Sequence, residues 1–237
     1  MINLKIVTSY NKMSTHLFII LCYRARGKQV HRKTQLDILL PAMKEYMKKF
    51  QVKYTLMVLE QNDDQHFNRG KLYNIGYLES LKRLQPGETP YYCHSNVDIV
   101  PKSVDYSLFT QGFRDIQGWE GGLGAMYFCD GDSYSAVNGY PNDMWGWGGD
   151  DSALIERAKV MNIPIDRSRY NNGDVEILPD NIVTCNGVTN DINRSKLYNY
   201  DMQNNRWRQN GLNTCEYSVQ SVVYNAEFNY YHYLVNL

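Results

Sequence analysis

The first hundred residues alternate between short apolar runs of strand length and longer segments whose apolar residues recur at helical spacing. The strand-like runs are residues 16–22, 54–59 and 91–99, and the helical segments are residues 35–50 and 69–84, the latter with Leu72, Ile75 and Leu81 expected to face inward. Strands that alternate with helices typically form a parallel sheet covered by helices. The sequence therefore predicts an α/β fold with a mostly parallel sheet.

The pattern is weaker in the second half of the chain. Residues 102–118 are expected to form a loop and a short helix, and another helix is expected to begin at Asp150. Residues 216–237 alternate in part, which predicts edge strands or a hairpin. The polar stretch 173–197 is expected to contain a mobile loop.

Length and charge limit the classes of protein to consider. A chain of 237 residues that is 43% hydrophobic can bury one sizeable core, which predicts a single domain over residues 1–237. Its 25 basic and 25 acidic residues give a net charge of zero. No overall positive field is present to recruit nucleic acid or an anionic membrane. The local basic cluster at residues 28–33 is expected to be a solvated helix face.

Residues 138–152 read NGYPNDMWGWGGDDS, which combines tryptophans, glycines and acids in one short stretch. Trp145 and Trp147 offer flat apolar faces, and the glycines let the backbone approach a ligand closely. Asp150 and Asp151 stand where a helix is expected to begin. A sugar suits this combination, because it has an apolar ring face and hydroxyl groups that need acceptors. The alternative is an aromatic core turn followed by a helix cap.

A second acidic motif follows the strand-like run that contains Tyr91–Cys93. Asp98 comes just after this run and just before Pro101, which places it at the carboxyl end of a strand. In open α/β sheets, nucleotides and their metals bind at such ends. A carboxylate there suits Mg²⁺ or Mn²⁺ bridging to a diphosphate. The alternative is that Asp98 is an ordinary turn residue.

In this order, the two motifs resemble those of the beta-1,4-galactosyltransferase family, inverting GT-A enzymes that transfer galactose from UDP-galactose. Residues 19–26, 67–77, 121–122 and 210–217 resemble further blocks of the family, also in order. The resemblance covers about residues 16–225. It implies a GT-A fold with a mixed, mostly parallel sheet, a nucleotide-binding half at about 16–101 and an acceptor and catalytic half at about 102–237.

The resemblance also implies roles for individual residues. Asp151 matches the catalytic base, and its place at a helix N-terminus is expected to keep it ionised. Asp150 is expected to bind donor-sugar hydroxyls, or simply to cap the helix. The implied donor and UDP-binding residues are Tyr23, Arg24, Arg26, Phe67, Arg69, Asn96, Val97, Asp98, Trp119, Gly121, Gly122, Trp147 and Asp150. The implied acceptor-binding residues are Tyr140, Trp147, Gly148, Gly149, Asp151 and Ser152.

The chain departs from the family pattern at three points. Asn96 stands where the family usually has an acid, which leaves Asp98 as the expected ligand of Mn²⁺ or Mg²⁺. The family's downstream Met and His ligands have no clear counterpart, so Asp180 is the candidate second ligand, with a turn residue as the alternative. Ser152 replaces a carboxylate that recognises the acceptor, which leaves the acceptor open between GlcNAc, xylose and another glycan or glycoconjugate.

These features predict a metal-dependent inverting transferase that moves a hexose, galactose first, from a UDP-sugar to a sugar hydroxyl in a β1,4-type linkage. The alternatives are a UDP-glucose or UDP-GalNAc transferase of the same fold, or an inactive sugar-binding module. Trp119 is expected to line the donor-sugar pocket and to exclude N-acetylated donors, unless it packs in the core. Adjacent acids on one helical turn do not suit a glycoside hydrolase, whose carboxylates lie ~5–9 Å apart across the sugar.

The expected location is the cytoplasm of a bacterium or of a virus-infected host. The first 14 residues lack the apolar run of a signal peptide, and residues 17–22 are too short to cross a bilayer. A soluble protein without a membrane anchor is therefore expected, unless the sequence is truncated. Five cysteines without C-x-x-C spacing fit reduced thiols.

Overall fold

An eight-stranded mixed sheet with the order β7-β5-β6-β3-β1-β2-β10-β9 organises the fold. The computed structural model describes residues 14–25, 31–146, 148–179 and 191–237. The strands of the sheet are β1 (Ser14–Tyr23), β2 (Lys53–Gln61), β3 (Glu88–Asn96), β5 (Phe113–Gln117), β6 (Met126–Asp130), β7 (Ile165–Asp166), β9 (Ser218–Asn225) and β10 (Tyr230–Asn236). The four central strands, β3, β1, β2 and β10, run parallel, and β6 and β9 pair antiparallel with them on either side. This is the mixed, mostly parallel α/β sheet that the sequence predicts.

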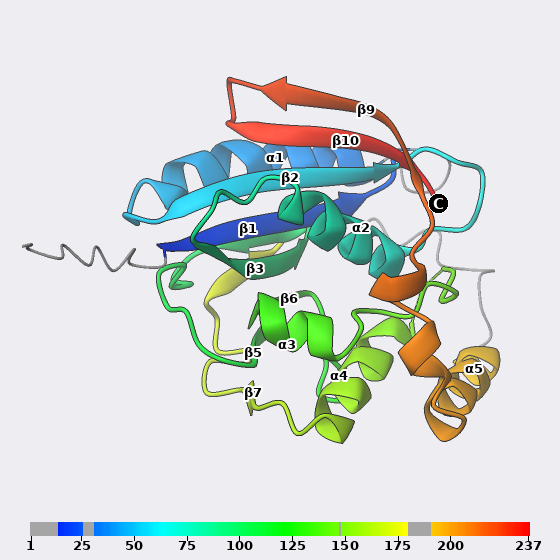
Figure 1. Ribbon diagram of the computed structural model, residues 1–237. Helices are drawn as coiled ribbons and strands as arrows, with labels where there is room; N and C mark the ends of the chain where they lie inside the picture. Colours follow the sequence, from blue (N-terminus) through cyan, green and yellow to red (C-terminus); the bar gives the residue numbers. More distant parts are fainter. Residues whose placement is uncertain (1–13, 26–30, 147, 180–190) are drawn as a thin grey trace, which may run out of the picture.

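Helices cover both faces of the sheet (Figure 1). They are α1 (His31–Met47), α2 (Arg69–Leu81), α3 (Gly131–Ala136), α4 (Asp150–Val160) and α5 (Asp191–Gln203), with short 3₁₀ turns η2 (Arg206–Gln209) and η3 (Leu212–Thr214). A separate two-stranded ribbon joins β4 (Ile99–Pro101) to β8 (Val175–Ile177). Among the described residues, no helix is long and apolar enough to cross a membrane.

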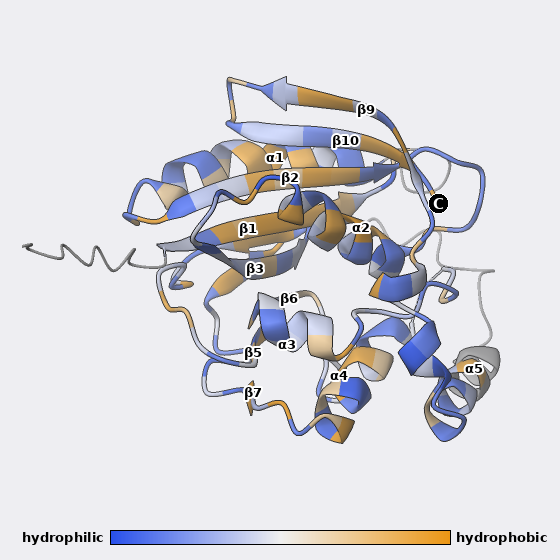
Figure 2. Ribbon diagram, in the orientation of Figure 1, coloured by the Kyte–Doolittle hydropathy of each residue, from blue (hydrophilic) through white to orange (hydrophobic). Residues whose placement is uncertain are grey.

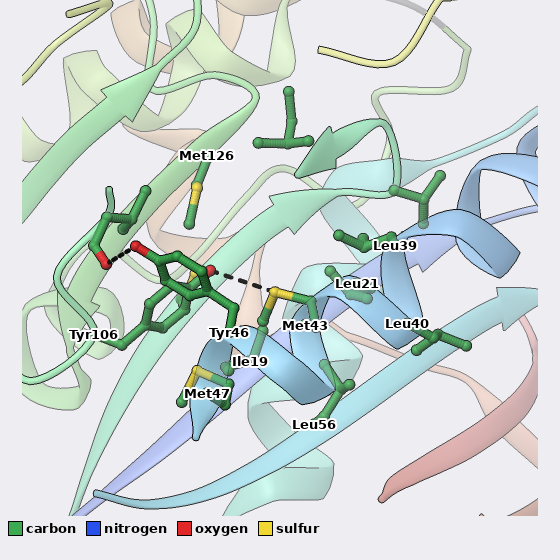
Figure 3. Close-up of a cluster of buried hydrophobic side chains, with 14 of the residues drawn as sticks. Ile19, Leu21, Leu39, Leu40, Met43, Tyr46, Met47, Leu56, Tyr106 and Met126 are labelled. Carbon is green, nitrogen blue, oxygen red and sulfur yellow. Dashed lines mark hydrogen bonds between the residues drawn. The ribbon is translucent and has the colours of Figure 1, made fainter. Parts of the chain in front are cut away.

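Strand β1 is buried on both sides because successive side chains point to opposite faces of a strand. Ile19 and Leu21 belong to the core under α1, where Leu39 and Met43 meet them (Figure 3). Phe18 and Ile20 belong to the core under α2. Figure 2 shows mainly hydrophobic colouring along β1 and the neighbouring β2, in agreement with this burial.

Helix α2 lies unusually close to β1. Its first residue follows Asn68, whose side chain accepts a hydrogen bond from the Lys71 amide and so caps the helix. Further along, a Cβ on Gly76 would lie 2.7 Å from a methyl carbon of Ile20. A glycine at this position lets the helix and the strand approach each other. The contact fixes where the N-terminal end of α2 meets the end of the sheet.

Several expected boundaries are corrected by the structure. Residues 102–118 contain no helix and include β5. Residues 191–197 of the polar stretch belong to α5, and residues 180–190 lie outside the described part. Helix α2 ends at Leu81, which is exposed rather than inward-facing. The third strand ends at Asn96, because Val97 and Asp98 form a turn. The expected C-terminal hairpin is present as β9 and β10.

Candidate active site

A cavity of about 600 Å³ opens at the carboxyl ends of β1 and β3, where α/β sheets generally bind their ligands. It lies between these strand ends, the first turns of α1, α2 and α4, and helix α5. Its lining consists of Cys22, Tyr23, Arg32, Phe67, Arg69, Asn96, Val97, Trp119, Gly146, Gly148, Gly149, Asp150, Asp151, Ser152, Tyr198 and Asn199. The structure thus gathers residues from both halves of the chain around one hollow.

Arg69 links the acidic residues at the start of α4 to the end of β3. Its Nε and Nη2 donate to Asp150 Oδ2 at 3.0 and 2.7 Å, and Nη2 also donates to Asp151 Oδ1. Its Nη1 donates to Asn96 Oδ1 at 3.3 Å. The residue that caps α4 is Gly149, so the expectation that Asp150 merely caps the helix is wrong. Both carboxylates are instead held at the cavity wall by one guanidinium.

Burial raises the pKa of Asp151 to about 7, with Arg69 opposing the rise and the charge of Asp150 adding to it. The helix N-terminus was expected to keep this carboxyl fully ionised. That expectation is corrected, because the loss of water around Asp151 outweighs the helix dipole and the arginine. A carboxyl whose pKa lies near neutral pH can accept and release protons in the physiological range.

Glycines and asparagine side chains determine the backbone conformation of the 138–149 segment. Gly146, Gly148 and Gly149 have φ of 85°, 92° and 86°, a region that favours glycine. Asn74 in α2 donates to the carbonyl of Tyr140 at 2.8 Å and to Asn142 Oδ1 at 3.0 Å. These bonds fasten the segment to α2 and direct it into α4.

The amide of Asn142 also joins this segment to the 210–217 segment. Its Nδ2 donates to the carbonyl of Gly211 at 2.7 Å, and its backbone amide donates to Asn210 Oδ1 at 2.8 Å. A Cβ on Gly211 would lie only 1.9 Å from the carbonyl oxygen of Asn138. The two sequence motifs are therefore packed against each other and joined by hydrogen bonds.

Trp119 also lines the cavity and is 55% exposed, so the alternative that it packs in the core is wrong. Its indole lies against Gly121 and Gly122, where an added Cβ would come within 2.3 and 2.7 Å of the ring. Gly122 also packs against Asp151, since a Cβ there would lie 2.6 Å from the Asp151 Cβ. The two glycines thus allow the loop to pack against both the indole of Trp119 and the side chain of Asp151.

Arg167 links the loop that carries Trp119 to Asp115 in β5. Arg167 donates to the carbonyls of Glu120 and Gly122 at 2.6 and 2.8 Å, and it lies 3.2 Å from Asp115 Oδ2. Burial raises the pKa of Asp115 to about 7, although Arg167 lowers it in part. This ion pair makes the loop part of the rigid sheet edge.

Asp98, the expected metal ligand, does not line the cavity but lies beside Arg32, which does. Arg32 Nη1 donates to Asp98 Oδ2 at 2.8 Å and to Gln35 Oε1 at 2.9 Å. Asp98 Oδ1 is buried and has no hydrogen-bond partner among the residues that the structure describes. In the described part of the chain, no group of three His, Cys, Asp or Glu residues could hold a metal ion. Asp180, the candidate second ligand, falls outside the described residues.

The remaining predicted site residues divide into three groups. Tyr23, Phe67, Val97, Gly148, Gly149 and Ser152 line the cavity. Arg24 donates to the carbonyls of Asp63 and Gln65 and is not part of the lining, and Tyr140 is fully buried against Tyr73 and Tyr134. Arg26 and Trp147 lie outside the described residues.

Sequence reasoning missed three cavity residues with functional side chains. Arg32 belongs to the basic cluster that was expected to be a solvated helix face, but its side chain is only 23% exposed. Tyr198 and Asn199 come from α5, which is held against α4 by the buried ion pair of Arg157 and Asp201 at 2.9 Å. A basic residue in the first turn of the helix after β1 was the available signal for Arg32. No local pattern marks the other two.

Two family models match consecutive parts of the chain. The first, described as the N-terminal region of glycosyl transferase group 7, matches residues 8–110. The second, described as the N-terminal domain of galactosyltransferase, matches residues 108–179. Together they span all the strands and helices from β1 to α4 and most of the cavity lining.

Curated relatives and solved structures agree with these models. The chain is 29% identical over 212 residues to beta-1,4-galactosyltransferase 4 of Rattus norvegicus, which covers 82% of this chain and 58% of that protein. It is 30% identical over 154 residues to beta-1,4-galactosyltransferase 2 of Homo sapiens, over 58% of this chain and 39% of the relative. The matched residues thus span 58% and 39% of the length of these two relatives.

The fold is that of a solved galactosyltransferase catalytic domain. The catalytic domain of Drosophila beta-1,4-galactosyltransferase 7 in complex with xylobiose superposes with a TM-score of 0.75 over 94% of both chains, at 18% identity. A mutant of that protein, in complex with manganese, UDP-Gal and xylobiose, gives a TM-score of 0.72 at 17% identity, again over 94% of both chains.

Proposed function

Because this chain belongs to the beta-1,4-galactosyltransferase family, glycosyl transferase group 7, we propose that it transfers a hexose from a UDP-sugar to a hydroxyl group of a glycan acceptor. The observation that carries the proposal is the arrangement of Asp150 and Asp151 on Arg69, together with the exposed Trp119, in one cavity at the strand ends. Carboxylates can accept sugar hydroxyls, and an indole can stack on a sugar ring. The proposal thus explains why acids, an arginine and an indole meet in one hollow.

Inversion at the sugar C1 follows if the acceptor oxygen attacks from the face opposite UDP. The new bond joins that oxygen to C1 while the bond from C1 to the UDP oxygen breaks, and UDP leaves with the electron pair. Asp151 takes the proton of the acceptor hydroxyl, for which its pKa near 7 is well suited. Asp150, fixed by Arg69, binds hydroxyls of the donor sugar.

A divalent cation, Mn²⁺ or Mg²⁺, would be held by Asp98. Its buried Oδ1 has no hydrogen-bond partner and is therefore available as a ligand. Cation sites that serve nucleotides often use one or two carboxylates and complete the shell with phosphate oxygens and water. When bound, such a cation offsets the negative charge of the diphosphate. Asp180 stays a predicted second ligand, and the neighbour's complex with manganese and UDP-Gal supports the choice of ion.

Galactose is the proposed donor sugar and a β1,4 linkage the proposed product, as the names of the relatives suggest. Xylobiose in the Drosophila protein supports a sugar acceptor, either a xyloside or the GlcNAc glycan expected from the sequence. UDP-glucose and UDP-GalNAc remain the competing donors. A cytoplasmic location stays a prediction from the sequence alone.

A screen of UDP-sugars with Mn²⁺ tests this function without knowledge of the acceptor. Slow hydrolysis of UDP-galactose, faster than that of other UDP-sugars, and binding of UDP by calorimetry are the expected results. Absence of UDP binding in both EDTA and Mn²⁺ would contradict the proposal. Tight UDP-galactose binding without hydrolysis, and without transfer to xylosides or GlcNAc glycans, would instead indicate an inactive sugar-binding module.

A further inference from the structure

Arg32 is a cationic side chain of the cavity with no role in the function proposed above. It lies in the first turn of α1, and its guanidinium is oriented by Asp98 Oδ2 at 2.8 Å and Gln35 Oε1 at 2.9 Å. Its side chain is 23% exposed and lines the same hollow as Asp151. The first turn of α1 contains no acidic residue, so the helix dipole adds to the positive potential there.

Two other arginines in the described part of the chain, Arg69 and Arg24, also form bonds to protein groups. Arg69 is bonded to both Asp150 and Asp151, so two negative charges already offset its single positive charge. Arg24 donates to the backbone carbonyls of Asp63 and Gln65, away from the lining. A donor diphosphate that enters the cavity brings more negative charge and needs a cation close to it.

Asp98 can serve two cations at once. Its Oδ2 accepts a hydrogen bond from Arg32, while its Oδ1 is buried and has no hydrogen-bond partner among the described residues. A cation on Oδ1 would therefore lie beside the guanidinium rather than replace it. The turn at residues 97–98 follows Asn96 at the end of β3, which places this pair next to the part of the lining made by Asn96 and Val97.

We propose that Arg32 binds the diphosphate of the nucleotide donor as a fixed, protein-supplied cation, held for this purpose by Asp98 and acting beside any divalent ion. The inference rests on the proposed function, since it assumes that a UDP-sugar occupies the cavity. It assigns a phosphate-binding role to a helix residue outside the segments that resemble the family motifs. Guanidinium groups suit this role, because they present several donors to phosphate oxygens in one plane.

Calorimetric titrations with UDP and with uridine, in EDTA and again with Mn²⁺, test the proposal. Uridine lacks the phosphates, so the ratio of the two affinities isolates the diphosphate contact from the rest of the pocket. Arg32→Gln should weaken UDP binding about 10- to 100-fold, as expected for the loss of a charge-assisted hydrogen bond, and leave uridine binding within about twofold of the wild type. Arg32→Lys, which keeps the charge but not the planar fork, should fall between the two.

Arg169→Gln is the matched control, because Arg169 also forms an ion pair with an aspartate, Asp174, but does not line the cavity. This control should leave the affinity ratio unchanged. An unchanged ratio in Arg32→Gln would overturn the proposal, whether both affinities stay the same or both fall through damage to the fold. A wild-type protein that binds uridine and UDP in neither buffer would contradict the proposed function itself.

Discussion

At the scale of single residues, the environment of Asp151 decides what the site can do. One arginine contacts both Asp151 and Asp150, yet burial still raises the pKa of Asp151 to about 7. The arginine keeps two adjacent carboxylates together, and it opposes the rise in the pKa of Asp151 without cancelling it. A carboxylate with a pKa near 7 is better able to take the proton of an acceptor hydroxyl than one with an ordinary, lower pKa.

Replacing Asp151 by Asn should reduce transfer about 10²- to 10⁴-fold, because the amide cannot take the proton. UDP affinity should stay within about threefold, since Asp151 does not hold the nucleotide. Steady-state kinetics and calorimetry measure the two effects. Asp143→Asn is the control, as Asp143 belongs to the same 138–152 segment but lies outside the cavity lining. Near wild-type turnover in Asp151→Asn would mean that another group is the base.

The rate of transfer should depend on pH through the same carboxyl. Asp151 acts as a base only when ionised, and its pKa is raised to about 7. The turnover rate should therefore fall about tenfold per unit as the pH drops below 7, and level off above it. The free energy of unfolding should change in the opposite direction. It should fall as the pH rises from about 4 to 7, because the carboxyl ionises near pH 4 in the unfolded chain but only near pH 7 in the folded protein. A turnover rate that is flat between pH 5 and 8 would contradict this assignment.

Trp119 should control which donor sugar is accepted. Its indole is held flat on Gly121 and Gly122 and projects into the cavity, so it occupies space that an acetamido group would need. Trp119→Leu should raise the preference for UDP-GalNAc over UDP-galactose about tenfold or more, a range typical of single pocket contacts. Competition kinetics measure the ratio directly. A wild-type preference for UDP-GalNAc would refute the steric argument.

At the scale of elements, close approach of α2 to β1 sets the position of Arg69 and of the cavity's edge. Gly76 makes the approach possible, because a Cβ there would lie 2.7 Å from a methyl carbon of Ile20. The same helix carries Asn74, which holds the 138–149 segment. A shift of α2 would therefore move both Arg69 and the segment that leads to Asp150 and Asp151.

Gly76→Ala should lower the free energy of unfolding by about 1 kcal/mol or more, since overpacking outweighs the gain in helix propensity. Denaturant unfolding measures the change. In an Ile20→Ala background the clash is gone, so the same substitution should be neutral or stabilising. An equal loss in both backgrounds would mean that α2 does not need this contact.

The elements that sequence patterns missed are those that depend on distant partners. Strand β5 contains Arg114 and Asp115, which look like loop residues but are both fully buried, and Asp115 forms an ion pair with Arg167. The central strands and α1, α2 and α4 were predictable because their apolar periodicity is local. Cavity residues in quoted motifs, such as Asp151, were predictable through resemblance. Arg32 was not, because its partner Asp98 is 66 positions away.

At the scale of the whole molecule, the two functional halves are not separate folding units. Strand β3 of the first half pairs with β6 of the second, and β2 pairs with β10 near the end of the chain. Cavity residues likewise come from both halves. The sheet is thus continuous across the division predicted at about residue 101.

Calorimetric unfolding of the protein should show one cooperative transition, as for a single domain. A fragment of residues 1–101 should show none, because it lacks the strands that cover β2 and β3. Circular dichroism during thermal denaturation of the fragment checks this expectation. A cooperative transition in the fragment would indicate that the first half folds independently.

The position of β10 between β2 and β9 also affects how the protein is made on the ribosome. Strand β2 ends at Gln61, but the strand that covers its edge is residues 230–236. At about 5 to 20 residues per second, roughly ten to thirty seconds of synthesis separate the two. During that time the edge of β2 is open to other growing chains. Production in cells should therefore be sensitive to translation speed and to the supply of chaperones.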